Sequence, residues 1–438
     1  MESRKRPIGV DLFAGAGGMT LGFEQAGFDV LAAVEIDPIH CATHEYNFPL
    51  WTTLCRDINK TSGREIRERS QIGDREIDVV FGGSPCQGFS LIGKRELGDP
   101  RNTLLKQFVR IVLELKPKYF VLENVRGLTI GKHQEFLGEI IQEFQANGYK
   151  LTEDYQILNA AHYGVPQARS RIFLLGCRQD LPLPKYPEPI TATNSKRAGK
   201  TKQTTTSTLP LVPTVWQAIG DLPEVQNHQE LFTKDWVIAK YGIPSEYAAK
   251  LRNLTEEENN YSYPRELDYT IITASLRTKH SEAAMQRFEQ TSHGKIEPVS
   301  RFYKLHPEGI CNTLRAGTAS NQGAFTSPRP IHPFTPRCIT VREAARLHSY
   351  PDWFRFHSTK WHGFRQVGNS VPPLLAKAIA SEVIKALGVQ PIKPIEIIPL
   401  GDEKLLELTM TQAAGKYLVD PQIIEPRKRD YKKLQTAV

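Results

Sequence analysis

Short apolar runs alternate with helix-like segments over the first part of the chain. Five runs are short and almost continuously apolar, which indicates buried strands: 8–13, 30–35, 78–82, 119–123 and 171–176. Apolar residues at helical spacing lie between them and predict helices over 19–26, 104–115 and 134–146. Strands that alternate with helices predict a parallel α/β sheet, with ligands bound at the carboxyl ends of its strands.

The pattern changes after about residue 180. Prolines cluster at 182–189, and 191–208 carries Lys196, Arg197, Lys200 and Lys202 among threonines and serines, which predicts a flexible basic surface loop. From there to about residue 336 the pattern is irregular and places no element. Helical spacing returns at 340–348 and 374–387, and a Pro-rich, then basic, tail follows from residue 390.

The composition of the chain indicates what kind of partner it binds and in which compartment it acts. The 438 residues are 40% hydrophobic, with a formal charge of +8, which favours a polyanionic partner. The six cysteines are scattered without a Cys-x-x-Cys pair, which argues against a zinc site or a disulfide framework. We see no signal peptide and no apolar run of about 18 residues, so we expect a soluble, reduced, intracellular protein without a membrane span.

A glycine-rich turn follows the first strand, in the segment Asp-Leu-Phe-Ala-Gly-Ala-Gly-Gly-Met-Thr that starts at Asp11. Its glycines let a ligand approach the backbone, and the helix that follows offers free N–H groups. A nicotinamide dinucleotide requires a third glycine where Thr20 stands, so a nucleoside without a pyrophosphate is favoured. Glu35, at the end of the second strand, can hold two ribose hydroxyls. A purely structural turn is the alternative.

A cysteine stands in a tight loop just past the third strand. The segment Gly-Gly-Ser-Pro-Cys-Gln-Gly-Phe-Ser places Cys86 between Pro85 and Gly88. Such a loop can expose a thiol and lower its pKa, which makes it a nucleophile. The other five cysteines are interpreted as small buried apolar residues.

Two further polar groups lie at strand ends. Glu123 follows the fourth strand and points into the same crevice as Cys86 if both strands share a sheet. Gln167, Arg169 and Arg171 lead into the fifth, and alternation places them on one face. Two guanidiniums together suit a phosphate or a polarised base, although solvated strand-end charges are the commoner case.

The combination of these motifs resembles the cytosine-5 DNA methyltransferase family, in its prokaryotic restriction-modification form. The glycine turn, the Pro-Cys-Gln-Gly-Phe-Ser loop, Glu-Asn-Val and Gln-x-Arg-x-Arg occur in the order that the family has. So do Thr-Val-Arg-Glu-Ala-Ala-Arg-Leu from Thr340 and Gln-Val-Gly-Asn-Ser-Val-Pro-Pro from Gln366. His348 stands where the family often has glutamine, and we expect little effect.

The resemblance implies a Rossmann-like S-adenosylmethionine-dependent methyltransferase sheet with a smaller, irregular target-recognition domain. It implies a catalytic and cofactor-binding domain at 1–180, target recognition at 181–336, a return segment at 337–390 and a C-terminal extension at 391–438, to which we assign no function. Thr340 and Arg342 would brace the recognition region, and the C-terminal helix would pack beside the first strand.

The resemblance also implies the chemistry. Cys86 would attack carbon 6 of a cytosine flipped out of duplex DNA, which makes carbon 5 nucleophilic toward the methyl group. Glu123, with a pKa raised by burial or by the base, would donate to ring N3. Arg169 would contact and orient the cytosine, with Arg171 beside it, and the basic middle region would contact phosphates.

The donor pocket is carried over residue by residue, with Asp57 at the adenine amino group and no metal. Its expected members are Phe13, Ala14, Gly15, Gly17, Gly18, Glu35, Ile36, Asp57, Ile58, Asn369, Ser370 and Val371. His40 and His44 stand one helical turn apart, but Cys41 follows the first histidine where a metalloprotease helix has glutamate, so a structural pair is favoured.

Partners and alternatives complete the predictions. We expect double-stranded DNA with a short specific target, action as a monomer in the nucleoid-containing cytoplasm, and either a cognate restriction endonuclease or a solitary role. A transfer RNA cytosine-5 methyltransferase is one alternative, although it usually has a shorter recognition region. A non-catalytic DNA-binding module is disfavoured by intact Cys86 and Glu123, and a nicotinamide oxidoreductase by Thr20.

Overall fold

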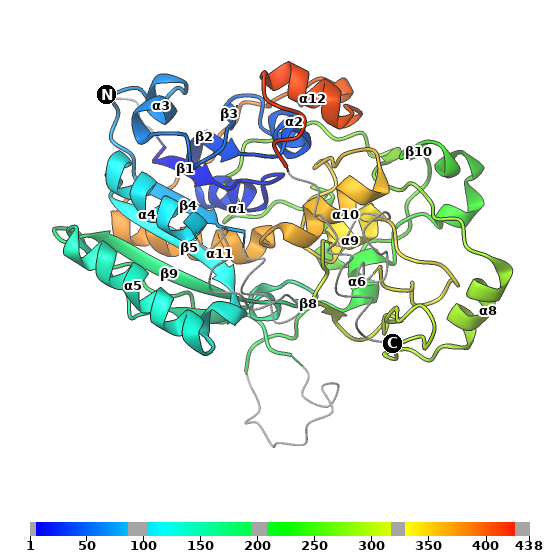
Figure 1. Cartoon of the computed structure of the whole chain (residues 1–438). Coiled ribbons are helices and arrows are strands. Elements are labelled where there is room, and N and C mark those ends of the chain that lie inside the picture. The colour runs from blue at the N-terminus through cyan, green and yellow to red at the C-terminus, as the bar shows by residue number, and fades with distance from the viewer. Residues whose placement is uncertain (1–5, 86–102, 194–207, 317–328, 425–438) are drawn as a thin grey trace, which may run out of the picture.

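An eight-stranded sheet forms the centre of the protein (Figure 1). The computed structural model describes residues 6–85, 103–193, 208–316 and 329–424. The main path of the sheet runs β3 (Thr52–Cys55), β2 (Asp29–Glu35), β1 (Ile8–Leu12), β4 (Val79–Gly83), β5 (Tyr119–Val125), β9 (Ser170–Arg178) and β6 (Tyr149–Leu151), and β7 (Gln156–Asn159) also pairs with β9. The first five of these strands are parallel, and β9 runs antiparallel to β5.

The parallel part of the sheet agrees with the sequence prediction because its strands are continuous apolar runs. Every side chain of β4 and β5 is buried except at the last residue of each strand. All five predicted strands are present, with ends that differ by one or two residues. The fold therefore contains the predicted parallel α/β sheet, and Glu35 and Glu123 lie toward the carboxyl ends of its strands.

Helices cover both faces of this sheet (Figure 1). On one face α1 (Gly18–Ala26) packs along α11 (Pro373–Leu387), and a Cβ added at Gly22 would collide with Ala376. On the other face α4 (Thr103–Leu115) contacts α5 (Lys132–Ala146) and α3 (Gly63–Glu68). The predicted C-terminal helix thus lies against the helix that follows the first strand.

The middle of the chain contains only short elements, which explains its irregular pattern. They include α6 (Val215–Ile219), α7 (Glu246–Leu251), α8 (Glu282–Gln290), β10 (Val237–Ile238), β11 (Ile271–Ile272) and β12 (Cys311–Asn312). Beyond them come α9 (Val341–Arg346) and α10 (Lys360–Asn369), and α9 begins with a capping box between Thr340 and Glu343. Two-residue strands carry too little periodicity to be recognised in a sequence.

One part of the middle region returns to the catalytic core. Arg265 forms a buried ion pair with Glu24 of α1, and the Tyr261 N–H donates to the Gln25 carbonyl. Arg265 also forms a β-bridge with Ile398 of the C-terminal extension. The segment around Tyr261 and Arg265 therefore packs on α1, beside the sheet, although it lies inside the predicted recognition range.

The C-terminal extension packs against α2 (Pro38–Asn47). Its helix α12 (Met410–Tyr417) contacts α2, and the Tyr417 hydroxyl donates to Glu45 at 2.7 Å. In the part of the chain that is described, no helix combines the length and apolar character that crossing a membrane requires.

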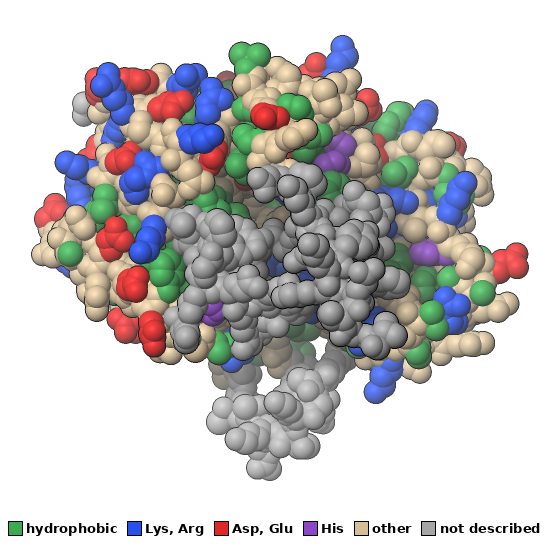
Figure 2. Space-filling model, viewed as in Figure 1, with side chains coloured by type: hydrophobic (Ala, Val, Ile, Leu, Met, Phe, Trp, Pro, Cys, Tyr) green, Lys and Arg blue, Asp and Glu red, His purple; other side chains and the backbone are tan. Residues whose placement is uncertain are grey.

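The charge of the middle region differs from the expectation. Over 208–316 and 329–336, acidic and basic residues occur in nearly equal numbers. Figure 2 shows one face of the molecule, and basic and acidic side chains are interspersed over its described parts. The basic loop residues Lys196, Arg197, Lys200 and Lys202 lie outside the described residues, so the prediction of a basic middle region does not hold for its described part.

Candidate active site

The carboxyl ends of β4 and β5 lie side by side. Gly83 is in register with Glu123, as expected if both strands share one sheet. Asn124 Nδ2 donates to the hydroxyl and the carbonyl of Ser84, at 3.1 and 3.4 Å, and thereby fixes the chain just past β4. Cys86 follows two residues later and lies outside the described residues. The anchored start of its loop is adjacent to Glu123.

Glu123 is buried beside a cation. Its Oε1 lies 2.9 Å from Arg171 Nε, and only 8% of the residue is exposed. Burial raises the pKa of Glu123, while Arg171 and then Arg169 oppose that rise; the net shift is upward, in the direction predicted. A Cβ at Gly83 would collide with Glu123 Oε2, so only glycine leaves room for this carboxylate against β4. Sequence reasoning missed that requirement at Gly83.

Arg169 and Arg171 differ in their surroundings, which changes the roles predicted for them. Arg169 is entirely buried, between β8 (Gln167–Ala168) and β9, and its guanidinium donates to three backbone carbonyls: Leu314 (2.8 Å), Gly368 (2.9 Å) and Ser370 (2.7 Å). Arg171 instead faces Glu123. This geometry does not favour the predicted contact of Arg169 with the base, because both terminal guanidinium nitrogens donate to backbone carbonyls.

The glycine-rich turn has the backbone conformation that its sequence predicts. Gly15 and Gly17 have φ of 57° and 104°, and Gly17 is the N-cap of α1. A Cβ at Gly15 would meet no atom within 4 Å, so the space beside the turn is open. The turn therefore leaves room for a ligand above the first strand.

Glu35 joins this turn to the next one. Its Oε2 accepts from the Gly15 N–H at 2.8 Å, and its Oε1 accepts from the Asp37 N–H at 2.9 Å. Each carboxylate oxygen has a second lone pair, so these bonds orient the group and leave it able to accept from a ligand. Sequence reasoning named Glu35 but did not foresee that it holds the glycine turn.

The other expected pocket residues surround the same edge of the sheet. A Cβ at Gly18 would stand 2.6 Å from the Val371 carbonyl and 2.8 Å from Ser370 Cβ, so the two distant segments touch. Asp57 Oδ1 accepts two bonds from Asn59, just past β3, which pairs with the end of β2. The remaining members comprise buried Ala14 and Ile58, half-buried Phe13 and Ile36, and exposed Asn369.

A buried polar chain underlies the turn. The Thr20 hydroxyl donates to Asp11 Oδ2 at 2.6 Å and contacts His44 Nε2 at 3.0 Å, and His44 Nδ1 lies 2.9 Å from the Thr53 hydroxyl. Both ring nitrogens of His44 therefore have threonine hydroxyls as hydrogen-bond partners. This agrees with a structural role for His44. Thr20, which excluded a dinucleotide fingerprint, binds Asp11 here. Across the described residues no group of three or more potential metal ligands is found.

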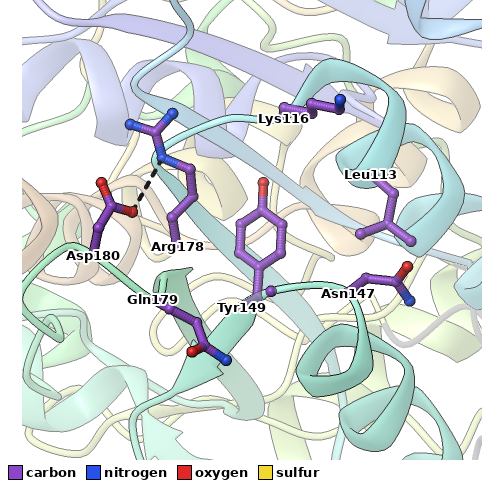
Figure 3. Close-up of a pocket in the computed structure, with 8 residues that line it drawn as sticks. Leu113, Lys116, Asn147, Tyr149, Arg178, Gln179 and Asp180 are labelled. Carbon is purple, nitrogen blue, oxygen red and sulfur yellow. Dashed lines mark ion pairs between the residues drawn. The ribbon is translucent and has the colours of Figure 1, made fainter.

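A surface hollow of about 530 Å³ lies away from these residues (Figure 3). It is lined by Lys116, Asn147, Tyr149, Arg178 and Asp180, among others, near the amino end of β5. Glu123 lies toward the opposite, carboxyl end of that strand. Arg178 and Asp180, which both line this hollow, form an ion pair at 3.7 Å. Its location separates it from the motif residues.

Comparison with known proteins agrees with this geometry. Residues 9–385 match the model of the C-5 cytosine-specific DNA methylase family. The chain is 57% identical over 424 residues to the type II methyltransferase M.XorII of Xanthomonas oryzae, covering 97% of this chain and 95% of that protein. It is 35% identical to the type II methyltransferase M1.HphI of Haemophilus parahaemolyticus, covering 86% of each chain.

A solved structure supports the same relationship. An E. coli prophage protein, described as a DNA modification methyltransferase, superposes with a TM-score of 0.70 at 32% sequence identity. The match covers 87% of this chain and all of that one.

Proposed function

The chain belongs to the C-5 cytosine-specific DNA methylase family, as a DNA cytosine-5 methyltransferase of the type II restriction-modification kind, and we propose how its residues perform the reaction. Cys86 is the nucleophile, Glu123 the proton donor and Arg171 the base contact. The observation that carries this assignment is the buried Glu123–Arg171 pair beside Gly83, three residues before Cys86. The substrate is a cytosine in a short specific sequence of duplex DNA.

S-adenosylmethionine is the methyl donor that the family implies, and the residues at the glycine turn fit it. The space beside Gly15 is open, and Glu35 is held by backbone N–H groups with acceptor capacity left for ribose hydroxyls. Asp57 faces the same strand edge and would take the adenine amino group. When bound, the donor supplies an electrophilic methyl group on a sulfonium. Ser370 and Val371 close the pocket from the far end of the chain.

The chain's own residues activate the base. The Cys86 thiolate adds to carbon 6 of cytosine, and Glu123 donates a proton to N3 as the ring accepts the electron pair. Carbon 5 becomes enamine-like and takes the methyl group. Loss of the carbon 5 proton then re-forms the ring double bond and expels the thiolate, with N3 returning its proton.

Glu123 must be protonated at the start of this sequence. Burial favours the neutral carboxyl of Glu123, while Arg171 at 2.9 Å favours the carboxylate. Glu123 can therefore hold or release one proton, depending on whether water or a base lies beside it. An uncharged cytosine that displaces water increases the burial of the pair and favours the protonated form. Arg171 then keeps the carboxyl directed at the base.

The reaction requires that the cytosine leave the duplex. A stacked base exposes neither face of carbon 6 to a thiol, and extrusion costs a few kcal/mol. The basic residues Lys196, Arg197, Lys200 and Lys202, which lie outside the described residues, would contact the phosphates. We also propose that the enzyme acts as a monomer in the nucleoid-containing cytoplasm, beside a cognate restriction endonuclease or alone.

Bisulfite sequencing of DNA from cells that express the protein tests this function. Wild type is expected to protect cytosine at one short sequence, and Cys86→Ala to protect none while still binding S-adenosylhomocysteine. Cys177→Ala, which removes a buried thiol from β9, is the matched control and should methylate normally. Methylation by Cys86→Ala, or protection of transfer RNA in place of DNA, would overturn the proposal.

A further inference from the structure

A closed ring of buried hydrogen bonds lies behind the candidate active site. Gln167 supplies one side: its Oε1 accepts from the Leu314 N–H at 3.0 Å, and its Nε2 donates to the Leu347 carbonyl at 3.2 Å. The same Nε2 lies 2.9 Å from His348 Nδ1. Gln167 and His348 are both completely buried.

Arg169 and Ser370 complete the ring. Arg169 donates to the carbonyls of Leu314 and Ser370, so Leu314 is bound through its N–H by Gln167 and through its carbonyl by Arg169. His348 Nε2 lies 3.1 Å from the Ser370 carbonyl. The ring therefore runs from Gln167 through Leu314, Arg169, Ser370 and His348 back to Gln167.

The partners of His348 determine its protonation. The Leu314 N–H donates to Gln167 Oε1, which fixes the orientation of the Gln167 amide and turns its nitrogen toward His348. An amide nitrogen donates and does not accept, so His348 Nδ1 must accept. A carbonyl can only accept, so His348 Nε2 carries the hydrogen and donates to Ser370. Burial, and then Arg169, hold the pKa of His348 well below its ordinary value, which agrees with this neutral tautomer.

The ring connects three parts of the proposed site. Ser370 and Val371 touch Gly18 of the donor turn. Arg169 stands two residues before Arg171, which faces Glu123. Leu314 belongs to the middle region and follows β12, which pairs with β8. His348 is the one side chain of the ring that bridges the Gln167 amide to the Ser370 carbonyl.

We propose that His348 is a positioning residue for methyl transfer, which fixes the distance between the donor segment at Ser370 and the strand that carries Arg171. The proposal rests on the proposed function for the placement of donor and base. It predicts that one substitution, at a residue that touches neither, weakens both donor binding and turnover.

Three variants test the proposal. His348→Leu keeps an apolar side chain of similar bulk but cannot bridge the two partners, whereas His348→Gln offers both a donor and an acceptor. His357→Leu is the matched control, because His357 is also buried and hydrogen-bonded through both ring nitrogens, to Thr359 and Leu408, outside the ring. Calorimetric binding of S-adenosylhomocysteine, steady-state kcat and KM, and Tm are measured for each.

His348→Leu removes two buried hydrogen bonds, and we expect it to weaken S-adenosylhomocysteine binding and to lower kcat by roughly tenfold each. His348→Gln should recover most of both. His357→Leu should lower Tm by a similar amount but leave both values near those of the wild type. If His348→Leu does not yield folded protein, His348→Asn, which is too short to reach both partners, takes its place with the same expectation.

Two results would overturn the inference: His348→Leu with wild-type affinity and kcat, or equal losses in His348→Leu and His357→Leu, which would indicate only general destabilisation. A wild-type protein that neither binds S-adenosylhomocysteine nor methylates DNA would instead contradict the proposed function. The two failures are therefore distinguishable.

Discussion

Arg169 and Arg171 are two residues apart yet have separate tasks. Arg169 donates hydrogen bonds to three carbonyls from segments that lie 145 to 201 positions away in the sequence. Arg171 forms an ion pair with the buried carboxylate of Glu123. A sequence shows that two arginines share a motif, but not which carbonyls come to surround one of them. The proposal that Arg171, and not Arg169, contacts the base therefore rests on the folded structure.

Lysine substitutions separate these tasks. Arg169→Lys should lower Tm strongly, because a single ammonium cannot reach three carbonyls that the planar guanidinium serves at once. Arg171→Lys should change Tm little and reduce kcat, because it alters the partner of Glu123. Thermal denaturation and a methyl-transfer assay check both variants. The reverse pattern, with Arg169→Lys stable but inactive, would restore the original assignment.

At the scale of elements, the apolar runs of β1, β4 and β5 were sufficient to predict the sheet. The end of α9 and the start of α11 were also foreseen to within one or two residues. The elements of the middle region were not, because strands such as β10 and β12 have two residues each and contain no recognisable period. Their positions depend on contacts with distant segments, as Arg265 illustrates.

The contact between α1 and the segment before α11 gives a second prediction. Gly18→Ala should weaken S-adenosylhomocysteine binding at least tenfold, because its methyl group would overlap the Val371 carbonyl and displace that segment. Gly138→Ala in α5 is the control: its methyl group meets nothing within 4 Å, and helix propensity favours alanine by up to about 1 kcal/mol. Equal affinity in the two variants would show that Gly18 does not set the pocket.

The polar chain below α1 predicts a dependence of stability on pH. Burial raises the pKa of Asp11 from 3.8 to about 8, so between these values the folded state holds a proton that the unfolded state has lost. Asp11 therefore contributes a free energy of unfolding that is fully present below about pH 4 and decreases as the pH rises toward 8.

Asp11→Asn removes this titration while keeping an oxygen for the Thr20 hydroxyl. The free energy of unfolding, measured by chemical denaturation from pH 5 to pH 8, should fall more steeply for wild type than for Asp11→Asn. Parallel curves for the two proteins would mean that Asp11 does not retain its proton in the folded state.

At the scale of the whole molecule, buried charges join the middle region to the return segment. Arg346 is completely buried and binds Asp352 at 2.6 and 2.7 Å and Asp221 at 2.9 Å. Arg342 donates to both the carbonyl and the hydroxyl of Thr273, which is the bracing role predicted for it. The two parts are therefore joined by buried ion pairs and hydrogen bonds.

Arg346→Met tests this connection. It should destabilise the protein by about 3–5 kcal/mol, because two buried carboxylates each lose their shortest ion pair. Arg64→Met, which breaks the exposed pair with Glu68, should leave the unfolding transition unchanged. Denaturant titration of both variants provides the measurement. An Arg346→Met transition that coincides with that of the wild type would contradict the role of these charges.

The central claim is that Cys86 forms a bond to carbon 6 of the target cytosine. The most direct measurement uses duplex DNA with 5-fluorocytosine at the methylated position, together with S-adenosylmethionine, analysed by denaturing electrophoresis and mass spectrometry. Fluorine cannot leave carbon 5 as a proton does, so wild type should remain covalently attached through the peptide that contains Cys86, and Cys86→Ala should remain free. Recovery of unlinked wild-type protein after methyl transfer, or attachment through another residue, would contradict the account.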